Sequence, residues 1–127
     1  MQGLLLVGLG GFLGAIARYA LGGLVAQATA DGRFPLATFT VNVLGCLLVG
    51  VLAGVAERYQ VFGAGARLFL FTGLLGGFTT FSAFGLEAVQ LIRRGDVGPA
   101  VLYAGGSVVF GIAAVWLGLR LVAMLPR

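Results

Sequence analysis

Four long apolar stretches with very few charges dominate this sequence. Hydrophobic residues make up 60% of the 127 positions and charged residues only 9%. Soluble domains carry charges at roughly 25% of positions, so a soluble fold of this size would lack the polar surface that it needs. A membrane-spanning helix takes about 20 apolar residues, and four such helices with short loops use the whole length. We therefore expect an all-α integral membrane protein that forms one transmembrane domain over residues 1–127.

Prolines and charged turns mark the ends of the expected helices. The four spans are predicted at about 3–28, 35–56, 67–93 and 99–124. Pro35 and Pro99 suit the first turn of a helix, where a proline forfeits no hydrogen bond. The charged turn at 93–96 separates the third span from the fourth.

The residue types present exclude several kinds of activity. The chain has no histidine and one cysteine, Cys46, which excludes Ser-His-Asp and Cys-His triads, HExxH zinc sites and an intrachain disulfide. Its basic residues are scattered, so the net charge of +4 does not indicate nucleic-acid binding. The sequence also lacks a pair of carboxylates or a nucleophile with a base. We expect that the chain is not an enzyme.

The arginines give almost no preference for one membrane orientation. Four spans place both termini on one side, and each side then carries four arginines: Arg58, Arg67, Arg120 and Arg127 on the side of the termini, and Arg18, Arg33, Arg93 and Arg94 opposite. The positive-inside rule needs a bias. Either a weak bias still decides, or the chain inserts both ways and two copies pair antiparallel. The second alternative would supply the inverted symmetry that larger transporters build from internal repeats.

Small residues at intervals of four mark two faces for helix contact. One face comprises Gly10, Gly14 and Arg18, and the other Cys46, Gly50 and Gly54. Small residues at this spacing let membrane helices approach closely. Four short helices still enclose little space, so we expect a pore or site to need an oligomer.

The strongest local anomaly is the Gly-Gly-Phe-Thr-Thr-Phe-Ser segment at 76–82, near the middle of the third span. Paired glycines and β-branched threonines are poor helix formers. This favours a break over a continuous helix whose hydroxyls bond back to the preceding turn. Carbonyls freed by a break must be satisfied by protein, water or an ion. Freed carbonyls at mid-membrane can hold a hard cation such as Na⁺.

Aromatic side chains around this segment are candidates for an ion pathway. Phe78, Phe81 and Phe84 are spaced by three and are expected on roughly one helix face. They either pack or face lipid, or they present their electropositive ring edges to a desolvated anion. The hydroxyls of Thr80 and Ser82 would then add hydrogen-bond donors.

Polar side chains in the other spans leave similar alternatives. An amide in hydrocarbon is costly unless paired, so Asn42 either bonds to another helix or donates to an anion. Tyr103 and Ser107, one turn apart, either continue a line of hydroxyl donors or bond within the bundle. Arg18 and Glu87 are the ionisable groups deepest in the spans, and such groups are functional candidates. Each is either structural or lies at the mouth of a pathway; Glu87 could pair with an arginine or cap backbone donors.

Three segments together resemble one family. The stretch at 76–84 resembles the GGxTTFSxF signature of the Fluc (CrcB) family of fluoride-specific ion channels. Residues 10–15 followed by Arg18 and Tyr19 resemble its first-helix motif, and Thr38 with 41–45 resembles its second-helix motif. The resemblance covers the full length, in the right order. The chain departs from some relatives at Gly111, one turn beyond Ser107, where they have a polar residue.

The resemblance implies a channel for passive export of fluoride across the inner (plasma) membrane, which lowers fluoride toxicity in the cytoplasm. It implies an antiparallel, dual-topology homodimer with two pathways, whose partners are fluoride, the lipid bilayer and a second copy of the chain. By motif position, the residues of the ion pathway are Asn42, Phe81, Phe84, Thr80, Ser82, Tyr103 and Ser107. The backbone carbonyls of Gly76 and Thr79 would hold a structural Na⁺ at the dimer interface.

Two other functions compete with this interpretation. The first is a small dual-topology, cation-coupled antiporter, in which Glu87 would be the coupling carboxylate. The second is a membrane subunit with no transport of its own.

Overall fold

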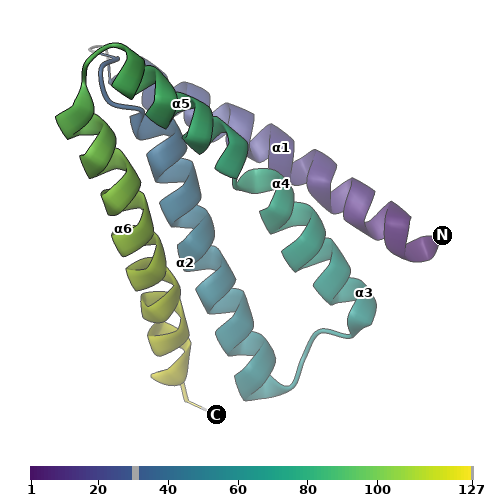
Figure 1. The fold of residues 1–127 in the computed structure, drawn as a ribbon. Helices are drawn as coiled ribbons and strands as arrows, with labels where there is room; N and C mark the ends of the chain where they lie inside the picture. Colours follow the sequence, from purple (N-terminus) through teal and green to yellow (C-terminus); the bar gives the residue numbers. More distant parts are fainter. Residues whose placement is uncertain (30–31, 127) are drawn as a thin grey trace.

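The computed structural model describes residues 1–29 and 32–126, and this part contains four helical spans that are long and apolar enough to cross a membrane (Figure 1). The spans are α1 (Gln2–Ala28), α2 (Leu36–Tyr59), a segmented third span (Ala64–Arg93) and α6 (Val97–Ala123). The predicted all-α membrane fold with a bent third helix is confirmed for the single chain. The antiparallel dimer stays a prediction, and Arg127 of the arginine comparison lies outside the described residues.

The four spans form two close pairs. The helices α2 and α6 run side by side, while α1 lies along the first half of the third span (Figure 1). Glycines make both approaches possible. A Cβ atom at Gly118 of α6 would lie 2.5 Å from the carbonyl oxygen of Leu47 on α2. A Cβ atom at Gly14 of α1 would collide with the carbonyl oxygen of Leu74.

The third span consists of four consecutive pieces. These are α3 (Ala64–Arg67), the π-helix η1 (Leu68–Leu75), α4 (Gly76–Phe78) and α5 (Phe81–Arg93). Between α4 and α5, Thr79 and Thr80 are extended, with φ/ψ angles of −82°/157° and −146°/117°. Thr80 then caps α5, because its Oγ1 accepts a hydrogen bond from the Ala83 N–H at 3.2 Å.

The break is therefore narrower than the predicted segment at 76–82. Gly76 and Gly77 remain helical, and only Thr79 and Thr80 leave the helix. The physical reason lies in α1: a Cβ atom at Gly77 would lie 2.5 Å from the carbonyl oxygen of Gly11. This glycine serves close helix approach, and the non-helical backbone is confined to the β-branched threonines.

Candidate functional site

Side chains from α1 and α2 bind the backbone of the broken helix. The Thr80 N–H donates to Asn42 Oδ1 at 2.8 Å, and Asn42 Nδ2 donates to the Thr80 carbonyl at 2.9 Å. In a continuous helix the Thr80 N–H would instead donate to the Gly76 carbonyl, four residues earlier. From α1, Arg18 Nε donates to the Gly77 carbonyl at 3.0 Å. The polar groups that the break frees are thus partly satisfied by protein, as a membrane interior requires.

Of the two alternatives for Asn42, the structure shows the bond to another helix. The amide nitrogen of Asn42 carries two protons, and its bond to Thr80 uses one of them. Asn42 also lines a cavity of about 450 Å³ between α2, α6 and the third span. The amide is therefore placed both to hold the break and to face this cavity.

The cavity brings together most of the predicted pathway residues. Its wall includes Asn42, Thr80, Phe81, Phe84 and Ser107. The Oγ atom of Ser107 is buried and has no hydrogen-bond partner within the part of the chain that the structure describes. Buried hydroxyls are rarely left unpaired in native structures, so this hydroxyl keeps a bonding capacity that the described part of the chain does not use.

The aromatic residues do not form one stripe. Phe78 is buried, with 7% of its surface exposed, whereas Phe81 is 84% exposed. The prediction that Phe78 shares a face with Phe81 and Phe84 is wrong, because the extended residues between them change the direction of the chain. The rings of Phe81 and Phe84 do lie together, with centroids 5.6 Å apart and planes inclined by 35°.

The carboxylate of Glu87 joins three helices. Thr38 of α2 donates its hydroxyl to Glu87 Oε1, and Tyr103 of α6 donates to Oε2, each at 2.7 Å. Tyr103 is fully buried, and its ring centroid lies 5.1 Å from that of Phe84. Among the described residues Glu87 thus pairs with two hydroxyl groups, in place of the arginine or backbone donors that the sequence left open. Of the hydroxyls expected to form a line of donors on the fourth span, that of Tyr103 is already bonded to Glu87.

Two features of the site were missed by reasoning from residues alone. The bond of Thr38 to Glu87 was not predicted, although Thr38 lies one turn before Asn42 on the same face of α2. That spacing is the signal that could have identified it. The π-helix η1, directly before the break, has no comparable signal in its sequence, although π-helical turns often occur at functional sites.

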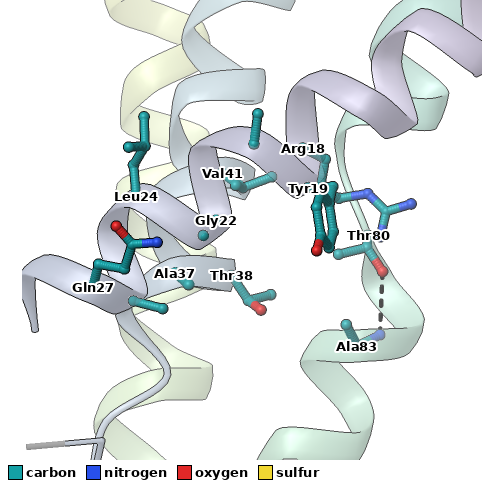
Figure 2. Close-up of a pocket in the computed structure, with 13 residues that line it drawn as sticks. Arg18, Tyr19, Gly22, Leu24, Gln27, Ala37, Thr38, Val41, Thr80 and Ala83 are labelled. Atoms are coloured by element: carbon teal, nitrogen blue, oxygen red, sulfur yellow. Dashed lines mark hydrogen bonds between the residues drawn. The ribbon is translucent and has the colours of Figure 1, made fainter. Parts of the chain in front are cut away.

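A second pocket, of about 500 Å³, opens on the other side of the break. Figure 2 shows Arg18 and Tyr19 of α1 close to Thr80, and Thr38 of α2 also lines the pocket. Among the described residues that line this pocket, Arg18 carries the charge. Ser82 lies near the pocket and is exposed; its Oγ is 3.4 Å from Thr80 Oγ1.

A cation at the break would have to be held by backbone oxygens. The described residues contain no group of three His, Cys, Asp or Glu side chains that could hold a metal ion. The Gly76 carbonyl has lost its usual helical donor to Asn42, and Thr79 is extended. The hydroxyl of Thr79 bonds back to the Leu75 carbonyl at 3.0 Å. The carbonyls of Gly76 and Thr79 fit the all-oxygen surroundings that hard cations prefer.

The family described as "CrcB-like protein, Camphor Resistance (CrcB)" matches residues 5–119. The chain belongs to the CrcB family. A relative from Methylobacillus flagellatus, named "Fluoride-specific ion channel FluC", is 52% identical over 98% of this chain and 97% of its own length. Relatives of the same name from Nitratidesulfovibrio vulgaris and Thermus thermophilus are 50% and 46% identical, over 94% and 95% of this chain and 95% of each relative.

Membership of the CrcB family confirms two predictions made from the sequence. The resemblance stated from three motifs is correct and extends over nearly the whole chain. Because these relatives are named as ion channels, the prediction that the chain is not an enzyme is also confirmed. The four apolar spans make it a multi-pass membrane protein.

Proposed function

We propose that this chain is a fluoride-selective channel of the inner (plasma) membrane that lets fluoride leave the cell passively. One observation carries the proposal: the Phe81–Phe84 ring pair, the Asn42 amide and the unpaired Ser107 hydroxyl surround one cavity. Fluoride is small and strongly hydrated, so a pore must replace its water with donors at close range. Amide and hydroxyl protons and electropositive ring edges do this without a full charge that would trap the ion.

The proposed pathway residues differ in their relation to the cavity. Its wall includes Asn42, Thr80, Phe81, Phe84 and Ser107. The Ser82 hydroxyl lies beside that of Thr80, and Tyr103 is buried against Phe84. Tyr103 acts by fixing Glu87 and by packing on Phe84, since its hydroxyl is bound to the carboxylate. Ser107 is the α6 residue of the cavity wall, and its hydroxyl has no partner among the described residues.

The working protein is an antiparallel dimer of two such chains. Phe81, 84% exposed in a single chain, would otherwise present a pathway ring to lipid. A second copy in the opposite orientation covers that ring and completes the wall of each pathway. The balanced arginines, four on each side, permit both orientations.

The carbonyls of Gly76 and Thr79 from each chain would hold a sodium ion at the dimer interface. When bound, it supplies positive charge that compensates the carbonyl dipoles of the two helix breaks. The residues of this chain present those carbonyls: Asn42 withdraws the Thr80 N–H from Gly76, and the extended backbone at Thr79 turns its carbonyl out of the helix.

The test is ion efflux from liposomes that contain the purified protein. With the membrane potential clamped, fluoride should leave rapidly and chloride should stay. Phe81→Ile should reduce fluoride efflux by at least about tenfold, because an aliphatic side chain has no electropositive edge. Phe12→Ile is the matched control, since Phe12 is an exposed ring of α1 outside the cavity lining. Equal efflux of chloride and fluoride would contradict the proposal.

The antiporter alternative has one discriminating variant. A coupling carboxylate must release and bind its proton or cation in each cycle, so Glu87→Gln would abolish transport that an imposed proton gradient drives. A channel predicts fluoride efflux in the wild type that follows the fluoride gradient and the membrane potential and does not respond to a proton gradient. The bonds from Thr38 and Tyr103 hold both Glu87 oxygens, which favours a fixed role for this carboxylate.

A further inference from the structure

Arg18 makes a long-range contact that the proposed pathway does not explain. Its Nε donates to the carbonyl of Gly77, 59 residues away in sequence, at 3.0 Å in a partly buried setting. Arg18 follows Gly10 and Gly14 on the face of α1 that lies against η1 and α4. Helix packing therefore delivers the guanidinium to the last turn before the break.

The carbonyls near the break are divided between different partners. Arg18 holds that of Gly77 and Asn42 holds that of Thr80. The carbonyls of Gly76 and Thr79 are those assigned to the cation. Successive carbonyls of an α-helix differ in direction by about 100° around its axis, so fixing the Gly77 carbonyl toward α1 also fixes where Gly76 points.

This turn needs such a tether. The helix α4 has only three residues and two of them are glycines, which resist unwinding less than other residues do. It is also the C-terminal end of the first half of the span, where the helix dipole is negative. A guanidinium is suited to that end, because it stays protonated and its bonds to oxygen are charge-assisted.

We infer that Arg18 is a positioning residue for the cation site: by holding the Gly77 carbonyl, it orients the Gly76 and Thr79 carbonyls toward the ion. The inference rests on the proposed sodium site. Arg18 does not touch the ion; its positive charge stays on the carbonyl that faces α1. The position of α1 and the affinity for sodium are thereby coupled through one hydrogen bond.

The experiment compares Arg18→Gln, Arg18→Lys and the control Arg120→Gln in the full-length protein. Arg120 lies in the last turn of α6, over the ring of Trp116. Thermal unfolding in detergent and fluoride efflux from liposomes are each measured while sodium replaces N-methylglucamine. We expect Arg18→Gln to raise about tenfold the sodium concentration that gives half of the maximal stabilisation against thermal unfolding. This corresponds to a loss of about 1.4 kcal/mol in the free energy of sodium binding. Saturating sodium should restore both stability and efflux.

The other variants sharpen the result. Arg18→Lys should shift the midpoint less, because an ammonium keeps the charge but loses the planar fork; Arg120→Gln should leave it unchanged. An unchanged midpoint in Arg18→Gln, with a sodium-dependent wild type, overturns this inference alone. Instability that sodium does not restore also overturns it, since Arg18 would then be a purely structural contact. A wild type that ignores sodium overturns the cation site and this inference with it.

Discussion

At the scale of single residues, the Asn42 side chain makes two hydrogen bonds to the helix break, and a substitution can measure what they contribute. It satisfies both the N–H and the carbonyl of Thr80. Asn42→Ala removes both partners and leaves two polar groups unpaired in a membrane interior. Each such group costs about 1–3 kcal/mol, so we expect a loss of about 2–6 kcal/mol in the free energy of unfolding, together with loss of fluoride efflux.

The control for Asn42 lies two residues earlier on the same helix. Thr40 lines a different, apolar pocket between α2 and α6, and Thr40→Ala should change stability by less than about 1 kcal/mol, as substitutions away from such networks usually do. Chemical unfolding in detergent micelles measures both variants. Equal destabilisation by the two substitutions would show that Asn42 does not hold the break.

At the scale of elements, the contact of α1 with the third span depends on glycine at a few positions only. A Cβ atom at Gly14 would collide with the backbone of Leu74, whereas one at Gly22, two turns later, would meet open space. Forcing a methyl group into a backbone contact typically costs about 1–3 kcal/mol. Gly14→Ala should therefore lower the unfolding temperature and the efflux rate, and Gly22→Ala should leave both unchanged or raise the unfolding temperature slightly.

This pair of substitutions also tests whether the helix contact shapes the site. If Gly14→Ala moves α1 away from η1, the bond from Arg18 to Gly77 lengthens and the break loses one of its two side-chain supports. Normal efflux in Gly14→Ala would mean that the break holds its geometry without α1. A loss of activity in Gly22→Ala would instead indicate a general effect of alanine on this helix.

The same contacts explain how far the sequence predicted the structure. Apolar runs define the four spans directly, because about 20 consecutive apolar residues form a helix long enough to cross a bilayer. The position of the bend followed from local helix propensity. Its extent did not: the glycine at 77 serves the close approach of the Gly11 backbone, and Phe78 is buried with its ring near Gly45 of α2. Single-sequence patterns do not report such contacts.

In the candidate site too, the sequence predicted some residues, and others depend on helix packing. Asn42, Phe81, Phe84 and Ser107 line one cavity, and their contact with an ion stays a prediction from the motif positions. The partners of Glu87 were not predicted, because Thr38 and Tyr103 come from two other helices whose rotation is set by packing. A charged group in a span suggests a charged partner, yet two hydroxyls satisfied its two oxygens here.

At the scale of the whole molecule, the proposed dimer accounts for the exposed ring of Phe81. In the single chain this ring is 84% exposed, and the proposed second copy would cover it. A tie of four arginines to four is compatible with either orientation in the bilayer. Arginines added to one side of the membrane should therefore fix the orientation of the chain, and the effect on fluoride efflux can then be measured. Gln2→Arg with Val61→Arg adds two arginines to the side of the termini, and Gln90→Arg with Val97→Arg adds two to the opposite side.

Each double variant should insert in one orientation, because the positive-inside rule then has a bias of six to four, two arginines added to an even tally. Accessibility of a C-terminal tag in sealed vesicles measures this. Expressed alone, each variant should lose most of its fluoride efflux, since two parallel copies cannot cover each other's Phe81. Expressed together, the two should recover it, because they can pair antiparallel. Full efflux from one uniformly oriented variant would rule out the antiparallel dimer while leaving fluoride conduction by some other assembly intact.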